Sequence, residues 1–94
     1  MIELMVTHPQ YNFLMEVLCA LPRAPLWCTI GQVMRDVHIA TPKGVYLVLY
    51  RVRKLGFGIH TFNKPNVGRA VHVERSSWPA VFIETNRYWR AVLA

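Results

Sequence analysis

Histidine, cysteine and carboxylate side chains are the groups in this sequence that could ligate a metal or act as a nucleophile. His60 and His72 are expected to lie near each other, because a predicted hairpin joins them. Cys19, Cys28 and His38 are isolated, and no two cysteines stand about two to four residues apart as in a zinc site. We therefore expect no metal ion and no cofactor, and we interpret these side chains as surface or half-buried groups.

Catalytic residues are equally hard to assemble from this sequence. The 5 carboxylates are scattered, with no pair at helical spacing, and Gly56 and Gly58 flank Phe57 as turn residues rather than as a phosphate-binding loop. A cysteine–histidine nucleophile pair needs a third, orienting group, for which the sequence offers no candidate. We expect that the protein is not an enzyme.

The excess of basic side chains is the feature of this sequence that indicates a type of function. The 94 residues include 11 Lys and Arg against 5 Asp and Glu, a formal net charge of +6. Residues 29–57 carry five cations against one carboxylate, and residues 58–75 carry three against one. Lys and Arg that neutralise phosphates release counterions, so a small basic protein favours an anionic partner, most often nucleic acid.

The composition also excludes several classes of protein. A hydrophobic fraction of 53% excludes a disordered chain. The longest apolar run, Val45 to Tyr50, is far shorter than the roughly 20 residues of a membrane span, and Glu3 replaces the basic start of a signal peptide. Two cysteines do not make a disulfide framework. We expect a cytoplasmic protein without a membrane partner, associated with the nucleoid when it binds DNA.

Capping residues and apolar spacing predict two helices in the first part of the chain. The first begins with Thr7 as cap, carries a helical apolar stripe and ends at Pro22. Residues 26–28 are predicted to be extended. Thr29 caps a short second helix, with Gln32 completing a capping box, and this helix is expected to fade near residues 36–38.

A third helix is predicted from Thr41 to Leu55, with Pro42 as its first residue and Gly56 at its C-terminal end. One arc of this helix is apolar and is predicted to be buried: Val45, Val48, Leu49, Val52 and Leu55. The opposite arc holds Lys43, Tyr46, Leu47, Tyr50, Arg51, Arg53 and Lys54.

The rest of the chain reads as a hairpin and an amphipathic tail. Two β-rich runs, 57–62 and 69–74, flank a turn-rich loop at 63–68. In the tail, residues 81–83 are compatible with a strand, but the helical spacing of the apolar residues favours a helix. The residues assigned to one side of this helix are Trp78, Val81, Phe82, Tyr88, Trp89, Val92 and Leu93.

The order helix, short strand, helix, turn, helix and hairpin resembles the winged helix-turn-helix superfamily of DNA-binding proteins. The segment 29–57, TIGQVMRDVHIATPKGVYLVLYRVRKLGF, carries most of the resemblance, which covers about Tyr11 to Glu74. The resemblance implies an α+β winged helix: a three-helix core with a helix-turn-helix plus a β-hairpin wing. Residues 1–76 would form this domain, and residues 77–94 a C-terminal amphipathic helix.

The resemblance and the charge distribution together predict a small transcriptional regulator or architectural protein that binds double-stranded DNA. The recognition helix, Thr41 to Leu55, would enter the major groove, and the wing, Asn63 to Arg69, would contact the backbone or the minor groove. The expected contact residues are Lys43, Tyr46, Leu47, Tyr50, Arg51, Arg53, Lys54, Lys64, Asn66 and Arg69.

Other interpretations of the third helix, the loop and the tail remain open. The basic face of the third helix could be only a solvated face, and the loop residues could be ordinary turn residues. The same fold could serve as a protein-interaction module, with Tyr46, Leu47 and Tyr50 as apolar anchors. The tail could pack back on the domain or pair with a second chain, and we expect a homodimer. The residues assigned to that dimer interface are Trp78, Phe82, Tyr88 and Trp89.

Overall fold

The chain folds as helices packed against a three-stranded antiparallel sheet, which confirms the predicted α+β class. A computed structural model describes residues 9–93. The elements of this part are, in order, α2 (Pro9–Ala20), β1 (Cys28–Thr29), α3 (Ile30–Asp36), α4 (Pro42–Lys54), β2 (Ile59–Lys64), β3 (Gly68–Val73), the 3₁₀ turn η1 (Arg75–Ser77) and α5 (Trp78–Leu93). Thr7, predicted to cap the first helix, lies outside the described residues.

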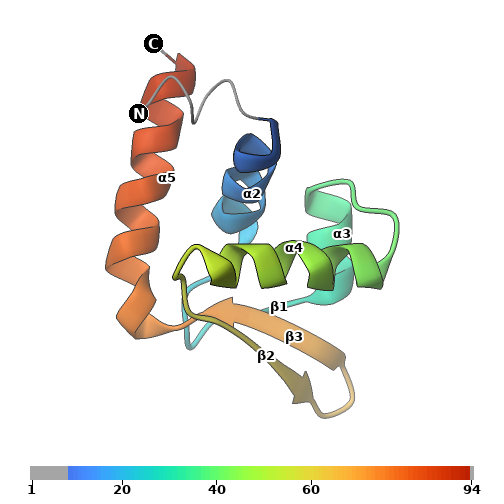
Figure 1. Cartoon of the computed structure of the whole chain (residues 1–94). Helices are drawn as coiled ribbons and strands as arrows, with labels where there is room; N and C mark the ends of the chain where they lie inside the picture. The colour runs from blue at the N-terminus through green and yellow to red at the C-terminus, as the bar shows by residue number, and fades with distance from the viewer. Residues whose placement is uncertain (1–8, 94) are drawn as a thin grey trace.

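The sheet has the strand order β1-β3-β2, so the hairpin strand β3 is central. In the hairpin, Ile59 pairs with Val73 and Lys64 with Gly68, while β1 adds Cys28 opposite Val71. Figure 1 shows α4 lying above the hairpin and α5 standing beside α2, at the opposite side of the molecule from α3. The helix α2 contacts both α4 and α5, and α4 also contacts α3 and β2.

The starts of α3 and α4 confirm the predicted caps. The Thr29 hydroxyl accepts a hydrogen bond from the Gln32 backbone N–H at 3.1 Å, and the Gln32 side chain accepts from the Thr29 N–H at 2.7 Å. The Thr41 hydroxyl accepts from the Gly44 N–H at 3.1 Å, and Pro42 occupies the first turn. These bonds satisfy donors that the first turn of a helix leaves without a partner.

The turn between α3 and α4 is tight because Gly44 has no side chain. His38 adopts a left-handed backbone conformation with φ 58°, and the Ile39 N–H donates to the Met34 carbonyl at 2.9 Å. A Cβ atom at Gly44 would lie 2.8 Å from Ile39 Cγ2. The glycine therefore lets the turn approach the first turn of α4 and sets the position of that helix on α3.

The core confirms the inner face of α4 with one exception. Val45, Val48, Leu49 and Val52 are buried, but Leu55 remains 47% exposed, so its assignment to the buried arc was wrong. Leu55 is the residue after the last helical turn, and the chain leaves α4 there through Gly56 at φ 101°. The buried apolar residues of the described chain are Met15, Val17, Leu18, Leu21, Ile30, Val33, Val45, Val48, Leu49, Val52, Phe57, Ile59, Ala70, Val71, Val73, Val81 and Tyr88.

The predicted helix in the tail is present as α5, but its expected apolar side divides into two. Val81 and Tyr88 are buried, and Trp78 is half-buried against the core. Phe82, Trp89, Val92 and Leu93 are exposed. Because α5 packs mainly on α2, only the arc that faces α2 is covered, and the neighbouring apolar arc faces solvent.

Candidate nucleic-acid interface

The outward face of α4 presents cations and two large apolar side chains to solvent. Burial of the opposite arc fixes this orientation, and the cap at Thr41 fixes where the helix begins. Leu47 and Tyr50 are 50% and 53% exposed. The exposed residues of this face are Lys43, Leu47, Tyr50, Arg51, Arg53 and Lys54.

A hydrogen bond joins this face to the hairpin. Arg69 of β3 donates through Nε to the hydroxyl of Tyr46 on α4 at 3.3 Å, and through Nη2 to the Thr61 hydroxyl of β2 at 3.5 Å. Tyr46 is half-buried and packs against the core, so it holds Arg69 from a fixed position. The cation of the hairpin and the cations of α4 are thereby parts of one surface.

The far end of α4 is tied to the start of β2. Arg53 donates through Nε to the Ile59 carbonyl oxygen at 2.8 Å. The Lys54 ammonium lies 5.2 Å from the ring centre of Tyr50, within the range of a cation–π contact. Arg53 therefore links α4 to the start of the hairpin, and its side chain as a whole remains exposed.

The tip of the hairpin separates two residues that the sequence assigned to the same contact. Arg69 pairs with Asn63, and Lys64 pairs with Gly68, so Lys64 and Arg69 project to opposite faces of the sheet. The Lys64 ammonium lies 5.3 Å from the ring centre of Trp27. Asn66 stands in the turn with φ 65°, where the Val67 N–H donates to the Lys64 carbonyl at 3.0 Å.

On the α4-facing side of the hairpin, Thr61 lies outside the contacts expected from the sequence, whereas Asn63 is the first residue of the expected wing, Asn63 to Arg69. Thr61 and Asn63 share the strand face of Arg69, because side chains alternate along β2 and oppose their partners on β3. The alternation of side chains along a strand was the available signal, but it identifies residues on the same face as Arg69 only when the register of the hairpin is known. We define the α4–hairpin surface as Lys43, Tyr46, Leu47, Tyr50, Arg51, Arg53, Lys54, Thr61, Asn63 and Arg69.

Among the residues that the structure describes, no carboxylate forms an ion pair with this surface. Within residues 9–93, the one ion pair joins Arg87 to Glu84 on α5 at 3.2 Å. The cations of the α4–hairpin surface therefore keep their charge available for an external anion. Exposed pairs contribute little to stability in any case, so these residues are not explained by a structural ion-pair network.

The opposite face of the sheet carries a ring cluster instead. His60 and His72 pair across the strands with ring centres 5.5 Å apart, and Phe62 stacks on His60 at the same distance. The predicted proximity of the two histidines is confirmed. Among the described residues, no three His, Cys, Asp or Glu side chains are grouped so that they could hold a metal ion.

The surroundings of the two thiols raise the pKa of both. Partial burial raises the pKa of Cys19, as does Glu16, while a hydrogen bond donated by Trp89 Nε1 to Sγ at 3.1 Å lowers it. Burial also raises the pKa of Cys28, with a contribution from Asp36. Neither thiol has the lowered pKa of an activated nucleophile.

The residues assigned to a dimer interface occupy different environments. Tyr88 is buried within the chain, and Trp78 is half-buried with the Arg23 guanidinium 5.5 Å from its ring centre. Phe82 and Trp89 are exposed. Two of the four side chains are thus accessible to a second molecule.

No protein-family model, curated protein or solved structure matches this chain. Within residues 9–93, none of the helices combines the length and the apolar character needed to cross a membrane. The candidate interface therefore rests on the geometry and charge of the α4–hairpin surface.

Proposed function

We propose that the protein is a winged helix that binds double-stranded DNA through the α4–hairpin surface. The observation that carries this proposal is the bond from Arg69 to Tyr46, which joins a cation of the hairpin to the exposed cationic face of α4. A helix that presents Lys and Arg beside a basic hairpin suits a duplex, because phosphates lie on both sides of the groove that a helix enters.

The arrangement of the elements supports the winged-helix assignment. Helix, strand, helix, helix and hairpin follow one another as α2, β1, α3, α4 and β2–β3, and β1 pairs with the second strand of the hairpin. In this arrangement α3 is the scaffold helix, α4 the recognition helix and β2–β3 the wing. The fold supports the assignment only together with the surface, because a fold alone does not determine function.

The positions of the side chains along α4 indicate which of them would contact bases and which would contact phosphates. Lys43 and Lys54 are separated by about 16 Å along the helix axis at 1.5 Å per residue, which is close to five base pairs of duplex. Lys43 and Leu47, in the first turns, are suited to guanine acceptors and thymine methyl groups. Arg51 and Lys54, near the other end, are suited to phosphates.

The salt dependence of DNA binding tests this division. We expect the double variant Arg51→Gln and Lys54→Gln to bind duplex DNA about 30-fold more weakly than the natural protein at 0.15 M salt, because each lost phosphate contact removes a slope of about 0.9 in log K against log salt. The slope itself should decrease by about 1.8. Fluorescence anisotropy with a labelled duplex over a salt series measures both quantities.

A control variant separates the surface from the net charge. Arg23→Gln with Arg75→Gln removes the same charge at a concavity next to Trp78 and Pro79, which contains no residue of the α4–hairpin surface. We expect this control to keep most of the affinity. Equal losses in both variants would show that α4 has no special part in binding.

Failure of the natural protein to bind any duplex at low salt would refute the proposal. The exposed Leu47 and Tyr50 would then favour the alternative of a protein partner, whose interface is dominated by apolar and aromatic anchors. In that case Leu47→Ala should weaken partner binding more than Lys54→Ala.

A further inference from the structure

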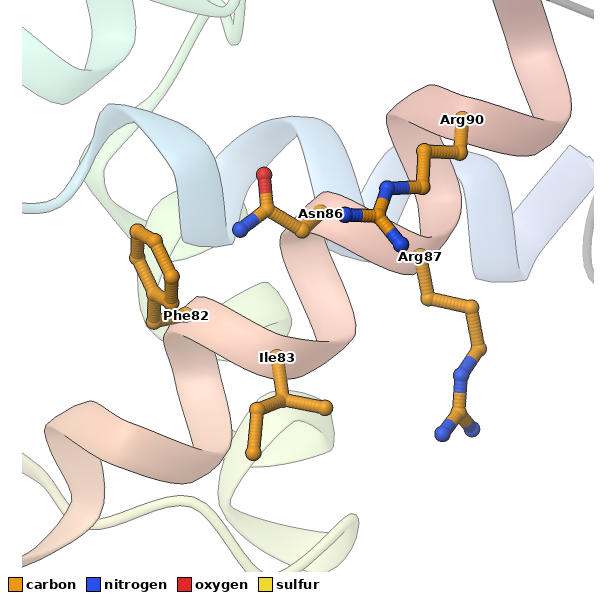
Figure 2. Close-up of a pocket in the computed structure, with 5 residues that line it drawn as sticks. All are labelled: Phe82, Ile83, Asn86, Arg87 and Arg90. Atoms are coloured by element: carbon orange, nitrogen blue, oxygen red, sulfur yellow. The ribbon is translucent and has the colours of Figure 1, made fainter.

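The outer face of α5 carries large apolar side chains among its polar ones, although it points away from the core. Figure 2 shows Phe82, Ile83, Asn86, Arg87 and Arg90 on this face, which together line a shallow concavity. Phe82 and Ile83 are each 55% exposed, and the inner residues Val81 and Tyr88 are buried. A surface helix normally carries polar residues opposite its buried arc, so large apolar side chains on the outer face indicate a contact.

The size of this face suits one half of a protein–protein interface. Phe82 and Ile83 are joined by Trp89, 41% exposed, and Leu93, 80% exposed. With about 200 Å² for each large apolar side chain, the exposed fractions of these four residues leave on the order of 450 Å² of apolar surface. A standard interface buries about 800 Å² on each partner, of which somewhat more than half is apolar.

The outer face of α5 is complementary to the same face of a second copy that runs in the opposite direction. Phe82 precedes Asn86 by four residues, and Arg90 follows it by four. In two antiparallel copies of α5 with the two-fold axis at Asn86, each Phe82 reaches the level of Arg90 and Trp89 of the other copy. An aromatic ring beside a guanidinium and an indole is a favourable contact, and it is formed twice. The two Asn86 amides meet at the axis, where each can donate to and accept from the other.

A parallel pairing lacks this complementarity. It would bring Arg90 of one chain to the level of Arg90 of the other chain, and the two copies of Arg87 would meet in the same way. Like charges at an interface cost free energy, whereas closed two-fold contacts between identical patches are the commonest form of protein dimer.

We propose that the protein forms a homodimer in which two α5 helices pack antiparallel, with Asn86 at the two-fold axis and Phe82 against Trp89 and Arg90 of the second copy. This interface uses the outer face of α5 and leaves the α4–hairpin surface free. The proposal does not rest on DNA binding, and it is tested without DNA. A two-fold dimer would also relate the two α4 helices by symmetry, so a DNA target would consist of two inverted half-sites.

The first experiment measures the mass in solution. Light scattering coupled to size-exclusion chromatography should give twice the chain mass of 10.9 kDa for the natural protein. Phe82→Glu should raise the dimer dissociation constant by at least about 30-fold, the effect of losing a central anchor residue. Leu47→Glu is the matched control, because Leu47 has a similar exposure on α4, and it should remain a dimer.

Circular dichroism shows whether Phe82→Glu keeps its helices, as expected for an exposed residue. A natural protein that stays monomeric at high concentration would overturn the proposal. So would a folded Phe82→Glu variant that dimerises as tightly as the natural protein, or dissociation of the dimer by Leu47→Glu.

A cross-linking experiment tests the direction of the helices. In a background with Cys19→Ser and Cys28→Ser, Asn86→Cys should form an intermolecular disulfide on mild oxidation. Arg90→Cys should not, because antiparallel pairing separates the two copies of this position by about 12 Å along the axis, beyond the reach of a disulfide. Cross-linking of both variants would show a parallel pair, and cross-linking of neither would show another interface; either result would overturn the antiparallel arrangement.

Discussion

Replacing Gly44 by alanine tests whether the turn between α3 and α4 is as close as the structure shows. Alanine is favoured over glycine within a helix by about 0.5–1 kcal/mol. At Gly44 the new methyl group would lie 2.8 Å from Ile39 Cγ2 and 3.3 Å from Thr41 Oγ1. Ile39 Cγ2 is attached directly to Cβ, so it cannot give way without a change of rotamer or backbone. Such forced shifts cost typically about 1–3 kcal/mol, and we expect Gly44→Ala to lower the free energy of unfolding by about 1 kcal/mol.

Gly31→Ala is the matched control for this change. Gly31 lies in the first turn of α3, and a Cβ atom there would meet nothing closer than Thr29 Oγ1 at 3.8 Å. The gain in helix propensity should appear alone and stabilise the protein by about 0.5–1 kcal/mol. The difference between the two glycine variants then isolates the contact with Ile39, and it should be about 1–3 kcal/mol.

A double-mutant cycle assigns the cost to the atom concerned. In the background of Ile39→Ala, which removes Cγ2, Gly44→Ala should change from destabilising to neutral or stabilising. Urea denaturation followed by circular dichroism measures each free energy of unfolding. If Gly44→Ala stabilises the natural protein as much as Gly31→Ala does, the close approach of the turn to α4 is refuted.

Three further predictions concern single side chains. Thr29→Ala removes the hydroxyl that accepts a hydrogen bond from the Gln32 backbone N–H, and it should lower the free energy of unfolding by about 1 kcal/mol in urea denaturation. Tyr46→Phe removes the acceptor for Arg69, so we expect weaker duplex binding by anisotropy and a loss of no more than about 1 kcal/mol in stability; unchanged binding would exclude a role for this contact. Burial raises the pKa of Tyr88 above its ordinary value of 10.0, so the folded state favours the neutral phenol. This stabilisation is fully present below pH 10.0 and is lost as the pH rises through the raised pKa of the folded state. Thermal unfolding of Tyr88→Phe should therefore show a smaller loss of stability at alkaline pH than the natural protein. Parallel curves of stability against pH would contradict this reasoning.

Local signals were sufficient to place the helices of the predicted core. Thr29, Gln32, Thr41 and Pro42 mark the starts of α3 and α4, because a helix cap is formed by residues three apart in the chain. The hairpin was recognisable for a similar reason, since the turn between Lys64 and Gly68 is built from adjacent residues. Sequence reasoning identified these elements without knowledge of their neighbours.

Which residues make up the candidate site was harder to predict from the sequence. Arg69 and Tyr46 are separated by 23 residues, and their contact depends on how the hairpin lies against α4. Lys64 was grouped with Arg69 because both lie near the loop, yet the register places them on opposite faces of the sheet. A shift of one residue in register would exchange those faces, and nothing local to the loop decides between the two registers.

Periodicity by itself determined that the third helix has one apolar and one basic arc, and it favoured a helix over a strand in the tail. It could not decide which apolar arc of α5 is buried, because apolar residues occupy more of that helix than one neighbour can cover. Tertiary packing decides this: in the folded chain, where α5 packs on α2, Val81 and Tyr88 are buried, while Phe82 and Trp89 stay exposed. Leu55 shows the same dependence, since its exposure follows from where the chain leaves α4 and not from its place on the helical wheel.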